Sequence, residues 1–206
     1  MTNRRFSKTI GLLAGLAMMA LAAPASAAPI SNSPTGLAAP TTTLTFNEVV
    51  VPNNTIITNQ YQAFGVTFGP NLVFNPQMTG FPNMVGNRLG NFFPIISTFT
   101  IDFNSAMSEI AFAMVTNPGV STFTALLDGV TVETFVAGTN FSSANNYYGF
   151  TGITFDQIRV DVGGRNGAML LDSLQFTVVP EPSTFALFGL ALGGLGFMVR
   201  RRKALG

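Results

Sequence analysis

The middle of the chain alternates apolar and polar positions with a period of two. Phe99, Ile101 and Phe103 are separated by threonine and aspartate, and Ile158 and Val160 flank an arginine in the same way. This period is typical of β-strands with one buried face, because successive side chains of a strand point to opposite sides. The pattern predicts β-structure, and no segment of the middle region has the 3.6-residue period of a soluble helix.

A hairpin is predicted where two such runs meet. Asp128-Gly129 joins 122–127 to 130–135 and is typical of a two-residue type I′ turn. Further strands are expected at 44–46, 66–68, 110–115 and 150–155. Roughly eight or nine short strands without a helix indicate an all-β fold, a single β-sandwich of the jelly-roll type.

The N-terminus follows a different pattern. Basic residues precede an apolar run over residues 10–23, and Ala25 and Ala27 then form a small-x-small site. This is the layout of a secretory signal peptide, so residues 1–27 are predicted to be removed on export. An uncleaved membrane anchor is the alternative. Residues 28–43, uncharged and rich in Ala, Pro, Ser and Thr, are expected to be a disordered linker before a domain at 44–179.

The C-terminus is predicted to cross a membrane as a helix. Residues 183–199 carry no charge, and a helix over them is roughly 25 Å long, enough for a hydrocarbon core. The basic residues that follow, Arg200, Arg201, Arg202 and Lys203, are expected to stay on the cytoplasmic side. The body then lies outside and the basic tail inside.

A tripeptide, Pro180-Glu181-Pro182, stands just before this span. Its two prolines fix φ and remove two N–H donors, so the segment stays extended at the membrane surface. An extended segment is what a membrane peptidase can grip. The alternative is a plain linker before a permanent anchor.

This order of tripeptide, glycine-rich span and arginine cluster resembles the PEP-CTERM sorting signal, over residues 180–206. Such signals occur in exported proteins of Gram-negative bacteria that make exopolysaccharide. The resemblance implies that an exosortase-type membrane peptidase recognises Pro180, Glu181 and Pro182 and cuts nearby. It also implies an inner-membrane precursor, held transiently through residues 183–199, which then passes to the cell surface or extracellular matrix.

Composition removes several chemistries. The chain has no His and no Cys, which excludes a Ser-His-Asp triad, a thiol nucleophile and an ordinary zinc site. The basic residues gather at the two ends, and the body has no lysine and more acidic than basic residues. Nucleic acid is therefore not expected as a partner, since phosphate contacts need basic side chains.

The carboxylates of the body do not suggest catalysis. Asp102, Glu133 and Asp161 fall on the polar phase of strands and are expected to be solvated, and Asp128 belongs to the predicted turn. A glycosidase needs two carboxylates in one cleft, and no pair stands out by spacing. We therefore predict a protein that is not an enzyme.

Asp172 is the exception. Stepping back by twos from Leu174 and Phe176 reaches Asp172 and then Leu170, so Asp172 is expected on the apolar face of the last strand. A buried carboxylate is costly unless it is paired, hydrogen-bonded or bound to a metal. It also fits a bulge or a strand start, where the carboxylate bonds to loop backbone.

The body also resembles galactose-binding-like β-sandwich modules. The matching segments run in the order TLTFNEV, QYQAFGVTF, STFTIDF, ALLDGVTVETF, FDQIRVDV and LLDSLQF. The resemblance implies a structural calcium ion held by an acid near the first strand and one in the last, here Glu48 and Asp172. Oxygen ligands suit calcium, so this is the one metal predicted.

Tyr147 and Tyr148 follow two asparagines in a predicted loop, and exposed tyrosines beside amides are a plausible saccharide platform. Alternatively one of the two packs inward, since neighbours on a strand point in opposite directions. The function expected is a non-catalytic exported surface or matrix protein, linked to extracellular polysaccharide. A carbohydrate-binding module is the alternative, and a secreted hydrolase is less favoured.

Overall fold

A computed structural model describes residues 28–70, 72–75, 78–91 and 97–179. The predicted signal peptide, Pro180-Glu181-Pro182 and the predicted span lie outside these ranges. No helix within the described ranges is long and apolar enough to cross a membrane.

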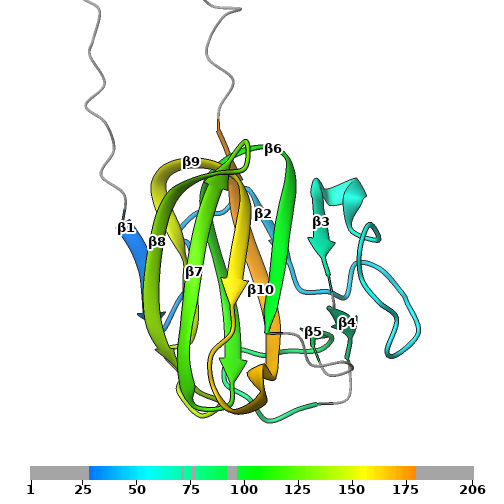
Figure 1. Cartoon of the computed structure of the whole chain (residues 1–206). Coiled ribbons are helices and arrows are strands. Elements are labelled where there is room, and N and C mark those ends of the chain that lie inside the picture. The colour runs from blue at the N-terminus through cyan, green and yellow to red at the C-terminus, as the bar shows by residue number, and fades with distance from the viewer. Residues whose placement is uncertain (1–27, 71, 76–77, 92–96, 180–206) are drawn as a thin grey trace, which may run out of the picture.

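The described chain is built from ten strands and two short 3-10 helices (Figure 1). The strands are β1 (Ala28–Ser33), β2 (Thr42–Leu44), β3 (Val66–Gly69), β4 (Val73–Phe74), β5 (Leu89–Gly90), β6 (Thr98–Thr116), β7 (Gly119–Leu127), β8 (Val130–Thr139), β9 (Tyr147–Asp161) and β10 (Met169–Val178). The 3-10 helices are η1 (Gln62–Phe64) and η2 (Arg165–Gly167). The predicted all-β fold is confirmed, and the strands form a single antiparallel sheet.

This sheet folds into two layers because β6 and β9 are long and serve both. The early part of β6 pairs with the late part of β9, and β3, β7 and β8 complete what we call the β7 layer. The late part of β6 pairs with the early part of β9, and β1, β10, β2, β5 and β4 complete the β10 layer. The register of β6 against β9 shifts between the two stretches, at residues 102–109 of β6.

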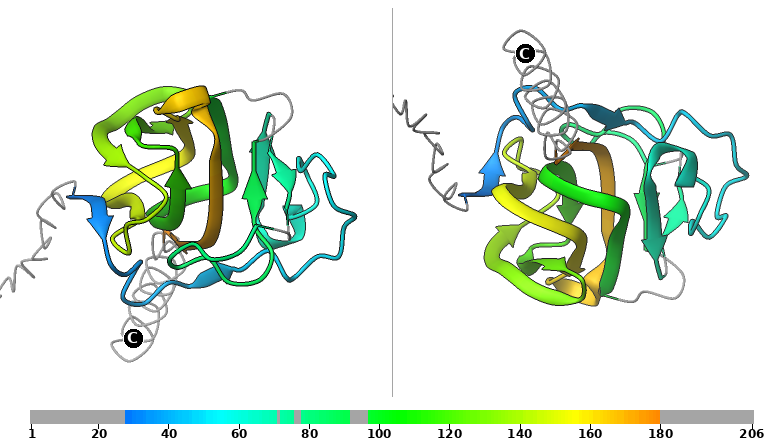
Figure 2. Two further views of the ribbon diagram at one scale, coloured as in Figure 1. Left: turned by 90° about the horizontal axis from the view of Figure 1, so that it is seen from below. Right: turned by 90° about the horizontal axis from the view of Figure 1, so that it is seen from above.

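Aromatic rings fill the space between the layers. Pairs that join the β7 layer to the β10 layer have centroids 4.9 to 5.2 Å apart: Phe123–Tyr148, Phe135–Phe150 and Phe103–Phe176. Views from both ends show the sheet curling around this interior, while the segment from β3 to β5 lies beside it (Figure 2). These contacts make the single sheet a β-sandwich in its packing.

The predicted hairpin forms as expected. Asp128 has φ 52° and Gly129 has φ 75°, and positive φ at both central residues defines a type I′ turn. The turn is also tied to the neighbouring strand, since the N–H of Asp128 donates to the carboxylate of Asp156 at 3.1 Å.

The prediction of a disordered linker at residues 28–43 is wrong. β1 pairs with β9, the N–H of Leu37 donates to Oε1 of Gln175 at 2.7 Å, and the N–H of Thr41 donates to the carbonyl of Phe176. A segment with few apolar residues still orders when a sheet edge offers it backbone partners. Composition does not reveal that edge.

Asp172 is buried and shares a face with Leu170 as expected, but the expectation that it shares a face with Leu174 and Phe176 is wrong. Asp172 is opposite Ala113 on β6, but Gln175 is opposite Ala111, so β10 bulges between them, and Ser173 has φ 51°. The bulge shifts the alternation by one residue. Leu174 therefore faces the core between the layers, whereas Asp172 lies on the outer side of the β10 layer with Leu170.

Both ends of the described chain leave the sandwich at one end, where β6 bends (Figure 1). The N–H of Val179 donates to the carbonyl of Ala106 in that bend. The start of β10 lies at the opposite end, since Met169 pairs with Thr116. At about 3.3 Å per residue the two ends of β10 are roughly 30 Å apart.

Candidate functional site

The outer side of the β10 layer is apolar and covered. Ala113, Val115 and Leu170 are buried there with Met84, and the partly buried rings of Phe81 and Tyr147 pack against them. The cover includes residues 78–88, which connect β4 to β5. These side chains form a second hydrophobic core, which we call the small core.

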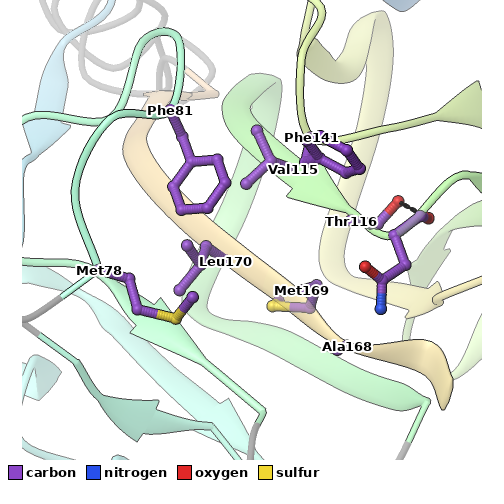
Figure 3. Close-up of a pocket in the computed structure, with 9 residues that line it drawn as sticks. Met78, Phe81, Val115, Thr116, Phe141, Ala168, Met169 and Leu170 are labelled. Carbon is purple, nitrogen blue, oxygen red and sulfur yellow. Dashed lines mark hydrogen bonds between the residues drawn. The ribbon is translucent and has the colours of Figure 1, made fainter. Parts of the chain in front are cut away.

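Beside this small core lies a pocket of about 290 Å³ (Figure 3). It is lined by Met78, Phe81, Val115, Thr116, Asn117, Phe141, Ala168, Met169 and Leu170. None of these residues is charged. Phe81 and Met78 approach from one side and Phe141 from the other, over a floor formed by β6 and β10 (Figure 3).

The pocket walls keep some apolar surface in water. The Phe141 side chain is 48% exposed and the Met78 side chain 37% exposed. Thr116 is buried, and its hydroxyl lies 2.7 Å from the carbonyl oxygen of Asn117 and 2.7 Å from the hydroxyl of Thr139. The site is thus an apolar hollow with polar atoms at one end.

Asp172 lies under the same cover, fully buried. Its Oδ2 accepts a hydrogen bond from the N–H of Val85 at 2.7 Å, and its Oδ1 accepts one from the N–H of Ser173 at 2.6 Å. Burial raises the pKa of Asp172 to about 6, against the lowering effects of these two bonds and of the nearby Arg88. The carboxylate clamps the covering segment to β10.

Arg88 is buried beside this carboxylate, with 1% of its surface exposed. Its Nη2 donates to the carbonyl of Gly86, but Nε and Nη1 have no partner in the structure. Burial lowers the pKa of Arg88, and the charge of Asp172 acts in the opposite direction. Two opposite charges are therefore held out of water at the edge of the small core.

The charge of Glu48 acts on Asp172 and adds to the rise of its pKa. Oε1 of Glu48 accepts hydrogen bonds from the N–H of Thr45 at 2.7 Å and from its hydroxyl at 2.9 Å. Across the described ranges, no group of three or more acidic side chains gathers where a metal ion would be held. Asp172 makes the contacts of the alternative, a bulge bonded to loop backbone, and calcium binding stays a prediction.

The predicted tyrosine platform is split by the fold. Tyr148 is 1% exposed, stacks on Phe123, and has its hydroxyl 3.2 Å from Oδ1 of Asn32. Burial raises its pKa to about 12. Because it is buried, Tyr148 is unable to contact a saccharide. The two tyrosines differ because neighbours on β9 point to opposite sides of the sheet. Tyr147 is partly buried against the small core.

The outer side of the β7 layer is polar and mostly partly exposed, with Thr124 buried within it. Register places its outward residues in rows across the strands: Thr67, Asp102 and Gln157; Thr100, Arg159, Thr124 and Thr134; Thr98, Asp161, Thr122 and Val136. The hydroxyls of Thr98 and Thr100 donate to Asp161 at 2.7 Å and to Asp102 at 2.6 Å.

Side chains of β9 complete this network. Gln157 donates to Asp102, and Nε of Arg159 lies 3.4 Å from Oδ2 of Asp161. Asp102 and Asp161, expected to be simply solvated, are in fact fixed by their neighbours. The alternation along the chain predicts the polar positions but not the rows, because the register across strands is absent from the pattern.

Comparison with known proteins identifies the C-terminus. Residues 178–203 match the family described as the PEP-CTERM protein-sorting motif. The chain carries a PEP-CTERM sorting motif. No curated protein is significantly similar to the chain.

The PEP-CTERM motif begins at Val178, the last residue of β10. The tripeptide Pro180-Glu181-Pro182, the basic cluster 200–203 and the predicted cleavage site at Ala25 and Ala27 all lie outside the described residues. The motif makes this an exported protein that is sorted through an exosortase and held transiently in the membrane before processing.

Proposed function

We propose that the body is a non-catalytic domain of the cell surface or extracellular matrix, with extracellular polysaccharide as its partner. The observation that carries this proposal is the PEP-CTERM motif starting where β10 ends. A cut near Pro180-Glu181-Pro182 then removes the predicted span and leaves every strand of the sandwich intact. The body, with no lysine, enters the matrix without an anchor.

The positions of the chain ends support an outward presentation. Both described ends leave the sandwich at one end, so that end faces the membrane in the precursor (Figure 1). The pocket lies at the other end of β10, roughly 30 Å away along the strand. Surfaces at the distal end are thus open to the matrix before and after processing.

A non-catalytic role is supported by the surroundings of the carboxylates. The pocket is lined by no carboxylate. On the polar face, Asp161 accepts a hydrogen bond from Thr98 and Asp102 accepts one from Thr100, and the two carboxylates do not face each other across a cleft. The chain also has no histidine and no cysteine to serve as base or nucleophile.

Mass spectrometry of both termini of the protein recovered from cells tests the sorting. We expect a start near Ala28 and an end near Pro180-Glu181-Pro182. Replacing that tripeptide by three alanines should leave the protein full-length in the inner membrane, whereas Pro118→Ala, in an exposed turn, should be processed normally. Normal loss of the C-terminal peptide in the triple variant would show that another release mechanism operates.

Carbohydrate binding is the second candidate function, and the polar rows of the β7 layer favour it. Their amide, carboxylate and guanidinium groups are already held in place by mutual hydrogen bonds, so little side-chain entropy is lost when hydroxyl groups bind. We expect processed protein to be retained on polysaccharide from the producing cells. Arg159→Ala should weaken retention and Val136→Ala, on the same face, should not.

A further inference from the structure

We propose that the distal pocket is a binding site for a small neutral molecule that is mostly apolar and has one hydrogen-bonding group at its end. This goes beyond the proposed function, which assigns polysaccharide to the polar face of the other layer. It concerns the hollow between residues 78–81, Phe141 and the start of β10 (Figure 3).

The lining selects a neutral ligand. No charged side chain borders the pocket, and most of its wall is aliphatic, aromatic or thioether. A charged group placed there would lose hydration without gaining a partner. Two of the lining residues are Met78 and Met169, whose flexible thioethers adapt to rings and chains of different outline.

The volume sets the size of the ligand. An apolar cavity of about 150 Å³ is enough to bind benzene. The 290 Å³ of this pocket therefore suits two fused rings or a short acyl chain. It is also open to solvent at Phe141 and Met78, which are partly exposed, so that a ligand enters without rearrangement of the fold.

Hydrophobic free energy provides the attraction. The exposed parts of Phe141 and Met78 are covered when the pocket fills, and burial of apolar surface is worth about 25 cal/mol per Å². The polar atoms of the wall come from Thr116 and Asn117, at one end. A hydroxyl, amide or ring N–H of the ligand is expected to lie at that end.

Indole is a suitable probe, because it is neutral, has two fused rings and carries one N–H. The experiment uses the full chain in lipid nanodiscs with ¹³C-labelled methionine methyl groups. We expect the signals of Met78 and Met169 to shift saturably on titration with indole. Met107, buried in the core between the layers, serves as the internal control and should not move.

Two variants test the location. Ala168→Phe places a ring in the pocket and should weaken binding by about tenfold or more. The matched control Val136→Phe adds the same ring on the exposed face of β8 and should leave the affinity within about twofold. Phe141→Ser removes an exposed part of the pocket wall and should weaken binding without affecting the fold. This variant tests the location even if Ala168→Phe does not fold.

Saturable shifts confined to the pocket methionines, lost in Ala168→Phe or weakened in Phe141→Ser, support the proposal. It is overturned if the pocket signals do not move, or if all methionine signals drift together without saturation. Equal affinity in the pocket variants and in Val136→Phe would also overturn it.

Discussion

The two outer faces of the sandwich are made largely by the same strands and yet have opposite character. On the β7 layer, β6 presents Thr100 and Asp102 to solvent, and the face is an open polar network. On the β10 layer, the same strand presents Ala113 and Val115, which are buried under the segment between β4 and β5. What differs is the cover: one face is left open and the other is closed by connecting chain.

The covered face also holds the buried charges. Asp172 of β10 and Arg88 of the cover are both buried, whereas Arg159 and Asp161 form an ion pair on the open face, with side chains 47% and 42% exposed. Arg88 and Asp172 interact through their charges in a buried setting, whereas water largely screens the exposed ion pair of Arg159 and Asp161.

Truncation on the covered face should cost the most. Leu170→Ala removes a buried side chain from the small core and should lower the free energy of unfolding by about 2–5 kcal/mol. Val136→Ala on the open face should change it by about 0.5 kcal/mol or less. Urea unfolding followed by tyrosine fluorescence measures both. Equal effects would mean that the cover is not packed on Leu170.

Removal of the buried guanidinium should be nearly as costly. Arg88→Met leaves the carboxylate of Asp172 buried without its neighbouring cation and should lower stability at pH 7 by about 3 kcal/mol. Adding Asp172→Leu should restore most of that loss. If the double variant were no better than the single one, Arg88 would act through packing rather than through its charge.

Acid should stabilise the protein. Because burial raises the pKa of Asp172 from 3.8 to about 6, the folded form keeps a proton that the unfolded chain releases, so stability falls as pH rises through this window. The gain from pH 7 to pH 4 is about 2 kcal/mol, or several degrees in melting temperature. No histidine titrates in this range.

The matching variant is Asp172→Asn, which should make the melting temperature nearly independent of pH between pH 4 and pH 7. Glu48 and Arg88 are the charged groups that act on Asp172, and Glu48→Gln should leave most of the pH dependence in place, since burial is its main cause. A wild-type protein that melts at the same temperature at both pH values would show that burial does not raise the pKa of Asp172.

The open ion pair should matter least for stability. Arg159→Ala should change the free energy of unfolding by less than about 1 kcal/mol, and 0.5 M salt should reduce even that, because both side chains are substantially exposed. The same variant is expected to be retained more weakly on polysaccharide. A large loss of stability would show that the polar rows support the fold rather than a ligand.

Much of the fold was predictable where local pattern and local chemistry agree. The alternation at Phe99, Ile101 and Phe103 fixes the inward face of β6, and Asp128-Gly129 forms the expected turn, since positive φ is cheap for these residues. The sorting motif was also readable, because its order along the chain is itself the signal. These features need no knowledge of distant contacts.

The candidate sites were less predictable, because each depends on residues far apart in the sequence. Asp172 was recognised as unusual, but its partners Val85 and Arg88 were not, since nothing local links them to β10. Nothing local showed which of Tyr147 and Tyr148 packs inward, since the ring that stacks on Tyr148 is Phe123 of β7. The pocket had no sequence signal at all.

The sequence by itself determined the all-β fold, the main hairpin and the sorting motif, because periodicity, turn chemistry and linear order act within a few residues. Tertiary structure alone decided that residues 28–43 are ordered, that the bulge at Ser173 turns Asp172 outward, and that one sheet face is covered while the other stays open. The physical reason is that sheet edges, registers and covers are set by backbone partners distant in sequence. The entropy lost in bringing these partners together is offset only when the whole core packs.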